Sequence, residues 1–309
     1  MSSYFKIVRP LNLLIIALTM YLVRHCLIIP IFKISERVNP DLSLTSMLHL
    51  NEVDFIMLVI AAICLAAAGN VINDYFDRTI DSINKPEKII IGKNISEKSA
   101  QIYYWILNVI GLLLTAYCAW KANVSSVFIV NIFALISLYV YSWMYKKTFL
   151  LGNLLIAFLS AGITVLAALP EPEFYVNSRY VLVYTAFALL LSLIREIVKD
   201  MEDIEGDEAQ GCRTIPVVIG IKNSRILVSF LCVSLISFVT YVIYVNFYVN
   251  SVFSFGNLLT LALLPFVILF FLILQTKDKR SFRVLSGYIK FLMLFGILSM
   301  IPFYYFFLR

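Results

Sequence analysis

The chain has 309 residues, of which 61% are hydrophobic and 14% are charged, and its mean hydropathy is +0.90. This is more apolar surface than the core of one soluble domain can bury, so the composition excludes an ordinary soluble protein and indicates an integral membrane protein. The net charge of +6 does not indicate nucleic-acid binding, because the sequence contains no recognisable nucleic-acid-binding module.

Apolar runs of about 20 residues, long enough to cross a hydrocarbon layer of about 30 Å, recur along the whole chain. They predict an all-α, polytopic membrane protein with nine transmembrane helices, at residues 11–31, 55–74, 100–120, 124–143, 150–169, 180–199, 225–246, 257–275 and 286–307. The first run is too long for a removable signal peptide, contains Arg24 and His25, and is not followed by a small-residue cleavage pattern. We therefore expect it to remain as a helix.

Lysine and arginine are concentrated at the N-terminus and after the second, fourth, sixth and eighth predicted spans. By the positive-inside rule, this predicts a multi-pass cell-membrane protein whose N-terminus and active-site loops are cytoplasmic and whose C-terminus is outside. The segment from Phe32 to Asp54 is mixed and polar, with Pro30 and Pro40 as breakers, and is expected on the outer surface. The five cysteines show no paired spacing, so we predict neither disulfides nor a zinc site.

Two acidic stretches interrupt the apolar pattern, one at the end of the second predicted span and one at the end of the sixth. Each carries polar side chains spaced by four, three and four residues, which at about 100° per residue share one face of a helix. Carboxylates on one face repel each other unless a cation lies among them. The first set is Asn70, Asp74, Asp77 and Asp81, with Asn73 beside it, and the second set is Glu196, Asp200, Asp203 and Asp207.

Each acidic stretch is followed by a basic loop, and a short sequence recurs after both, IGKNIS at 91–96 and IGIKNS at 219–224. This weak internal repeat predicts two similar helix–loop units, at about 55–120 and 180–246, within a single domain spanning 1–309. Such units would oppose the two carboxylate faces across a central cavity. Polar residues beside the first and fourth spans are either interfacial anchors or part of the same site: Arg9, Asn12, Tyr141, Ser142 and Lys146.

The location of the carboxylates indicates their chemistry. They lie where their spans reach the interface, whereas a coupled-ion transporter is expected to hold its carboxylates near the bilayer midplane. Carboxylates and substrate phosphate oxygens suit Mg²⁺, and the overhanging lysines and arginine complement the phosphate charge. At the mouth of an apolar bundle, this combination predicts binding of a substrate with a diphosphate head and a long apolar tail. Mg²⁺ would stabilise the departing diphosphate, and an acceptor would attack the allylic carbocation that remains.

At these residues the chain resembles the UbiA-type intramembrane prenyltransferase superfamily. NDYFDRTID at 73–81 matches the family's NDxxDxxxD motif, and Asp203 with Asp207 matches its DxxxD motif. The resemblance covers essentially the whole chain. It implies a helical bundle with a central cavity, a lateral opening to the lipid, and two Mg²⁺ ions bridged to an isoprenyl diphosphate.

The resemblance also implies roles for individual residues. The catalytic residues it implies are Asp74, Asp77, Asp203 and Asp207. The metal ligands it implies are Asn70, Asn73, Asp74, Asp77, Asp81, Glu196, Asp200, Asp203 and Asp207. The diphosphate-binding residues it implies are Lys85, Arg213, Tyr141, Ser142 and Lys146; Arg9 and Asn12, from their place beside the first span, are further candidates for this role.

Within the superfamily, the stretch LIREIVKDMEDIEGDEAQGCRTIPVVIG is most similar to the digeranylgeranylglyceryl phosphate synthases. This implies transfer of a geranylgeranyl group to geranylgeranylglyceryl phosphate in ether-lipid biosynthesis, with no nucleic acid and no obligate protein partner. One departure is Ile89, which stands where the family often has a second proline in the first loop. The alternatives are prenylation of an aromatic quinone precursor such as 4-hydroxybenzoate or a naphthoate and, from another class, a cation or lipid-phosphate transporter.

Overall fold

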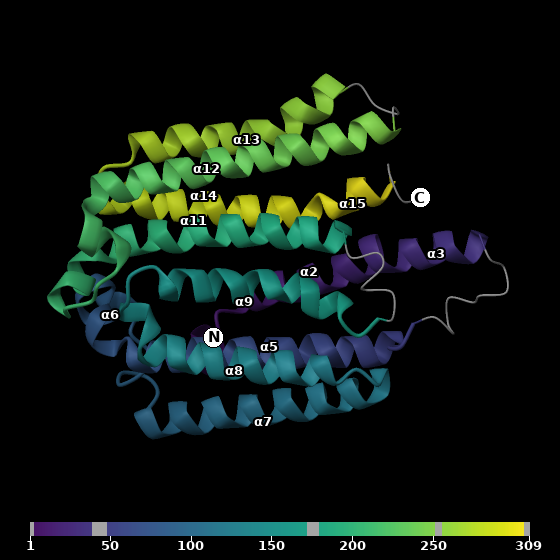
Figure 1. Ribbon diagram of the computed structural model, residues 1–309. Helices are drawn as coiled ribbons and strands as arrows, with labels where there is room; N and C mark the ends of the chain where they lie inside the picture. The colour runs from purple at the N-terminus through teal and green to yellow at the C-terminus, as the bar shows by residue number, and fades with distance from the viewer. Residues whose placement is uncertain (1–2, 39–47, 172–178, 251–254, 306–309) are drawn as a thin grey trace. The chain divides into compact units, whose positions relative to one another are not determined.

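The computed structural model describes residues 3–38, 48–171, 179–250 and 255–305, and this part of the chain is almost entirely helical (Figure 1). It contains no β-strand, only an isolated bridge between Ile91 and Ile95. The all-α prediction is therefore confirmed. The first helices are α1 (Ser3–Ile7), α2 (Pro10–Leu22), the π-helix η1 (Val23–Ile28), α3 (Ile29–Val38), α5 (Glu52–Phe76), α6 (Arg78–Asn84), α7 (Glu97–Ala122) and α8 (Ser125–Trp143). The later ones are α9 (Leu151–Ala168), α11 (Arg179–Ala209), α12 (Ile215–Asn250), α13 (Phe255–Gln275), α14 (Lys279–Leu298) and α15 (Met300–Phe303).

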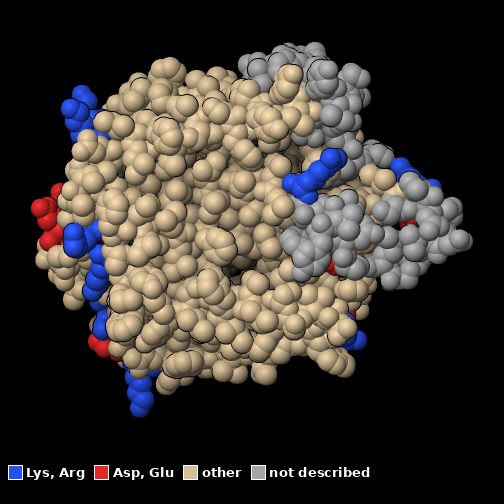
Figure 2. Space-filling model, viewed as in Figure 1, with Lys and Arg blue, Asp and Glu red and all other residues tan. Residues whose placement is uncertain are grey.

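Eight helical runs among the described residues are long and apolar enough to cross a membrane. They begin with Pro10–Ile34, which joins α2, η1 and α3, and they end with Lys279–Phe303, which joins α14 and α15. The predicted span at 257–275 falls on α13, which is not among these eight, so the count of nine is not confirmed. Uncharged side chains cover most of the face drawn in Figure 2. The chain is an integral multi-pass membrane protein.

The described helices form two compact units. The first comprises Met1–Tyr145 and Gly162–Leu182, and the second comprises Lys146–Ala161 and Val183–Phe307. In the first unit, α5, α7 and α8 lie side by side (Figure 1). Close contact between α5 and α8 depends on Gly69, because an added Cβ there would lie 2.9 Å from Cδ1 of Leu138. The small residue near the end of α5 therefore allows close helix packing.

The N-terminal segment packs against the end of α5 that the sequence predicts to face the cytoplasm. Ile7 and Val8 are buried in an apolar cluster with Val71 and Ile72 of α5 and with Ile91 of the following turn. The amide of Asn70 also donates a hydrogen bond of 2.9 Å to the carbonyl of Val8. The chain entering α2 is thereby fixed beside the first acidic stretch.

In the second unit, the apolar cluster lies on one face of α11 and includes residues from α12, α13 and α14. Leu191, Ile194 and Val198 of α11 are fully buried in it. At about 100° per residue, these positions lie roughly opposite the stripe that carries Glu196 and Asp200. The polar stripe therefore does not contribute to the apolar core of its own unit.

The second copy of the short repeat differs in structure from the first. The segment 91–96 precedes α7, whereas 219–224 lies inside α12, after that helix has begun at Ile215. The helical path of α12 is broken at Gly220, which has φ 78° and ψ 158°. A new helical segment therefore follows each acidic stretch, but the local structure in which it begins differs between the two.

Pro30 does not break the first helical run, contrary to the sequence prediction. The helix continues through Pro30 to Val38 because the preceding turn, Val23–Ile28, is a π-helix. A π-helical turn is wider than an α-helical one, so it relieves the clash between a proline ring and the carbonyl four residues earlier. Pro40 lies outside the described residues.

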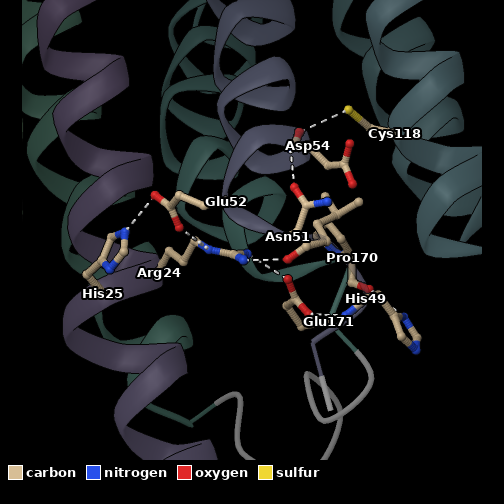
Figure 3. A network of polar contacts seen from close by, with 10 residues as sticks. Arg24, His25, His49, Asn51, Glu52, Asp54, Cys118, Pro170 and Glu171 are labelled. Carbon is tan, nitrogen blue, oxygen red and sulfur yellow. Dashed lines mark hydrogen bonds and ion pairs between the residues drawn. The ribbon is translucent and has the colours of Figure 1, made fainter. Parts of the chain in front are cut away.

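A buried ion pair joins the first span to the chain that follows α9 (Figure 3). Arg24, which is 1% exposed, donates to Oε1 of Glu171 at 2.7 Å and to the carbonyl of Leu50 at 2.5 Å. Glu171 in turn accepts from the backbone N–H of His49 at 2.9 Å, and Oε1 of Glu52 lies 3.2 Å from Nε2 of the His25 ring. Residues 49–52 belong to the segment before α5 that we expected on the outer surface. These polar and charged contacts hold them in place.

We predict that Arg24→Leu lowers the free energy of unfolding by about 3–5 kcal/mol, because it leaves the buried Glu171 carboxylate without its guanidinium. SDS-titrated unfolding in mixed micelles measures this loss. Lys279→Ala is the matched control, since the Lys279–Glu205 pair, 2.9 Å apart, is much more exposed and its loss should cost less than about 1 kcal/mol. Equal losses in the two variants would show that the Arg24 network does not stabilise the fold.

Candidate active site

The first acidic stretch continues along one helical path that is interrupted at a single residue. Asp77 ends α5 and precedes α6, and its backbone N–H still donates to the carbonyl of Asn73 at 2.9 Å. The Asn73 amide donates to Oδ2 of Asp77 at 2.6 Å, and both side chains are at least nine-tenths buried. The N–H of Asp81 donates to the Asp77 carbonyl at 2.8 Å, so the predicted four, three, four spacing is kept on one path.

Arg9 makes a direct contact with this stretch. Its Nη2 donates to Oδ1 of Asp74 at 2.5 Å. Desolvation lowers the pKa of Arg9, but the charges of Asp74, Asp77 and Asp81 offset this, and the pKa is raised overall. Arg9 has φ 55°, a left-handed conformation that is costly for a residue other than glycine. The strain is maintained by the buried neighbours Ile7 and Val8 and by the ion pair itself.

The second acidic stretch lies on α11 and has different partners. The amide of Asn153, on α9, donates to Oδ2 of Asp200 at 2.7 Å. Oδ2 of Asp207 accepts from the Thr214 hydroxyl at 3.2 Å, and Asp207 is 4% exposed. Both partners belong to the same compact unit as α11.

Glu196 is the innermost carboxylate of this stripe, and it is 6% exposed. Its Oε1 accepts from Nη1 of Arg195 at 2.5 Å, and its Oε2 lies 3.8 Å from Nζ of Lys199. Two cations therefore compensate its charge. This distinguishes Glu196 from Asp200, which accepts a hydrogen bond from the neutral amide of Asn153.

The helix carrying the second stripe ends in a Schellman motif. The N–H of Cys212 donates to the carbonyl of Asp207 at 2.9 Å, and the N–H of Gly211 donates to that of Glu208 at 3.1 Å. Gly211 takes φ 66°, which glycine adopts without a Cβ penalty. The chain turns back immediately, and the N–H of Arg213 donates to the carbonyl of Lys147 at 2.9 Å.

The other predicted diphosphate-binding residues lie at helix ends. Asn12 is in the first turn of α2, and its N–H donates to the carbonyl of Arg9 at 2.9 Å. Lys85 follows α6, with its N–H donating to the carbonyl of Asp81 at 2.9 Å. The buried residues in the last turn of α8 are Tyr141 and Ser142, while Lys146 lies in the following 3-10 turn (Tyr145–Lys147).

Within the described residues, no three His, Cys, Asp or Glu side chains lie close enough together to hold a metal ion by themselves. The carboxylates of each stripe are spread along their helix instead. Such a set fits Mg²⁺, which is held by one or two carboxylates together with water and substrate phosphate oxygens. The donor types fit this ion as well, because they are carboxylate and amide oxygens.

Comparison with known proteins decides the family. The profile of the UbiA prenyltransferase family matches residues 42–301. The chain belongs to this family. It is therefore a prenyltransferase, and the transporter alternative from the sequence is not supported.

Two relatives have names that indicate a substrate. The digeranylgeranylglyceryl phosphate synthase of Methanothermobacter thermautotrophicus is 31% identical over 295 residues, which cover 94% of this chain and 92% of the relative. The digeranylgeranylglyceryl phosphate synthase of Methanobrevibacter smithii is 30% identical over 250 residues, covering 80% of this chain and 86% of the relative.

Solved structures share the fold. A structure described for digeranylgeranylglyceryl phosphate synthase in membranes matches with a TM-score of 0.66 at 24% identity, over 97% of this chain and 96% of that one. A UbiA homologue from Archaeoglobus fulgidus, bound to GPP and Mg²⁺, matches with a TM-score of 0.60 at 17% identity, over 97% of this chain and all of that one.

Sequence reasoning missed three polar contributors to these stripes. Asn153 and Thr214 lie outside both acidic stretches, and a single sequence carries no signal that pairs them with Asp200 and Asp207. For Arg195 the sequence did contain a signal, because a charged residue inside an apolar span is a candidate for function.

Proposed function

We propose that this chain transfers a geranylgeranyl group from its diphosphate to the free hydroxyl of geranylgeranylglyceryl phosphate, in ether-lipid biosynthesis. The observation that carries this proposal is the similarity to a digeranylgeranylglyceryl phosphate synthase over 94% of the chain. The acceptor carries its own phosphate, which suits the many lysines and arginines near the acidic stretches. We place the reaction at the cytoplasmic side of the membrane, following the distribution of positive charge.

We also propose that two Mg²⁺ ions act in the reaction. Asn73, Asp74, Asp77 and Asp81 would serve one ion, and Asp200, Asp203 and Asp207 the other. The presence of GPP and Mg²⁺ in the Archaeoglobus fulgidus relative supports this choice of metal. Glu196 is left out of the set because Arg195 and Lys199 already compensate its charge.

The chain's own residues have defined tasks in this reaction. Bound Mg²⁺ supplies electrostatic stabilisation to the departing diphosphate. Arg9 lies at Asp74, where its planar guanidinium can donate to diphosphate oxygens once it leaves the carboxylate. As the bond between C1 of the prenyl group and the diphosphate oxygen breaks, the electron pair leaves with the diphosphate. The acceptor oxygen then bonds to C1 and loses its proton.

A transfer assay tests the acceptor. Purified protein in detergent, given radiolabelled geranylgeranyl diphosphate, is expected to label geranylgeranylglyceryl phosphate in the presence of Mg²⁺ and not in EDTA. A parallel reaction with 4-hydroxybenzoate tests the aromatic alternative. Label in the aromatic product alone would keep the prenyl-transfer chemistry and overturn the proposed acceptor.

Asp77→Asn and Asp203→Asn are each expected to lower product formation by roughly 100-fold or more, because each removes a charged metal donor while keeping its shape. Both variants should unfold at the temperature of the wild-type protein. The control is Glu208→Gln, an exposed carboxylate on α11 outside the stripe, which should leave activity unchanged. Wild-type turnover by Asp77→Asn or Asp203→Asn would remove that residue from the site.

Asn153→Leu should raise the Mg²⁺ concentration needed for half-maximal activity by roughly 10-fold. The reason is that loss of an outer hydrogen bond to a metal-binding carboxylate typically costs about 10- to 100-fold in metal affinity. Asn223→Leu is the matched control, because its amide bonds only to the carbonyl of Ile219 in its own helix among the contacts found. The same Mg²⁺ dependence in both variants would show that Asn153 does not orient Asp200 for metal binding.

A further inference from the structure

We propose that Ser192 and Glu196 of α11 form the site that binds the attacking hydroxyl of the acceptor lipid, with Glu196 accepting its proton. This inference rests on the proposed function, since it concerns how the same reaction handles its second substrate. It assigns Glu196 a role other than the metal binding that its place in the acidic pattern predicts.

The Ser192 hydroxyl has no hydrogen-bond partner among the described residues, although Ser192 is only 3% exposed. Hydroxyl groups inside the other helices generally donate to the carbonyl four residues earlier. Ser142 does so at 2.8 Å, Thr115 at 2.8 Å and Thr240 at 2.7 Å. The Ser192 hydroxyl does not, so it is a buried group that remains available to donate and to accept a hydrogen bond. Leaving such a group without a partner is costly, which indicates a bond to something bound.

Ser192 continues the polar stripe of α11 by one turn. It lies four residues before Glu196, so the two side chains share one helix face. That face is roughly opposite Leu191, Ile194 and Val198, which fill the apolar core of the unit. Both residues are nevertheless buried. The stripe therefore has a deeper, enclosed end made of one hydroxyl and one carboxylate.

Glu196 has the charged neighbours that this task needs. The guanidinium of Arg195, 2.5 Å away, and the ammonium of Lys199, 3.8 Å away, place two positive charges beside its carboxylate. An ionised carboxylate only accepts hydrogen bonds, so it recognises a hydroxyl by its proton. The Ser192 hydroxyl can donate to the oxygen of the same acceptor hydroxyl.

The spacing along α11 suits two substrates. Glu196 lies seven residues before Asp203, which is about 10 Å along the helix axis. A diphosphate held near Asp203 would have its apolar chain directed to the membrane interior, with C1 between the two groups. In the reaction, the acceptor oxygen forms a bond to C1 as the C1–O bond to diphosphate breaks. The hydroxyl proton passes to Glu196, and the electron pair of the broken bond leaves with the diphosphate.

The variant Glu196→Gln tests whether Glu196 accepts the proton of the acceptor hydroxyl. We expect product formation to fall by roughly 100-fold or more, the usual contribution of a positioned general base. We expect the Kd for a non-reactive geranylgeranyl thiolodiphosphate with Mg²⁺, measured by calorimetry, to stay within about twofold of wild type. A Kd weakened as much as in Asp203→Asn would make Glu196 a metal-site residue and overturn the inference. An unchanged rate would overturn it as well.

Ser192→Ala tests the binding part and should not impair folding, because the hydroxyl makes no bond in the described structure. Binding of geranylgeranylglyceryl phosphate is compared with that of an analogue lacking the attacking hydroxyl. Wild type should prefer the hydroxyl compound, and Ser192→Ala should reduce that preference by roughly fivefold. The control is Ser229→Ala, which removes another hydroxyl without a partner, on α12, and should keep the wild-type preference.

The outcomes separate this inference from the proposed function. If the wild-type protein labels the glycerophosphate lipid but Ser192→Ala keeps the wild-type preference, the inference fails and the function stands. If the wild-type protein prenylates only the aromatic acceptor, the proposed acceptor fails, and the hydroxyl site fails with it.

Discussion

The compensation of charge at membrane depth is the constraint on which the structure depends. Carboxylates near the ends of α5 and α11 are tolerated only where a cation or a hydrogen-bond donor faces them. The chain provides a different partner for each: Arg9 for Asp74, the Asn153 amide for Asp200, and Arg195 with Lys199 for Glu196. The Arg24–Glu171 pair meets the same demand elsewhere in the first unit.

The partners differ in how easily they can be displaced. Asn153 is neutral, so its bond to Asp200 leaves that carboxylate's charge available for a metal ion. Arg9 is a cation at Asp74, held in a strained backbone conformation. A divalent ion that replaces it at the carboxylate would release both the guanidinium and part of that strain. In the proposed reaction, the binding of metal and the binding of diphosphate would be coupled through the Arg9 side chain.

Much of the fold, and the helix faces that carry the acidic residues, could be predicted from the sequence because helical periodicity is local. The spacing of Asp74, Asp77, Asp203 and Asp207 places each pair on one helix face, and the helices bear this out. Contacts between distant segments could not be predicted: nothing local pairs Asn153 with Asp200, or Arg24 with Glu171. The continuation through Pro30 was also missed, because a π-helical turn has no distinct sequence pattern.

A stripe of four carboxylates looks uniform in the sequence, but in the structure its members have different surroundings. Glu196, at the inner end, has two cationic partners, so its charge needs no metal. Asp207, at the outer end, accepts a hydrogen bond from the neutral hydroxyl of Thr214. Its carbonyl accepts from the N–H of Cys212, in the turn that contains Gly211. One helix face therefore presents a charge-compensated carboxylate at its inner end and, at its outer end, the carboxylates that we propose as metal donors. An enzyme that joins a membrane-embedded hydroxyl to a prenyl group carrying a water-facing diphosphate needs these two environments in this order.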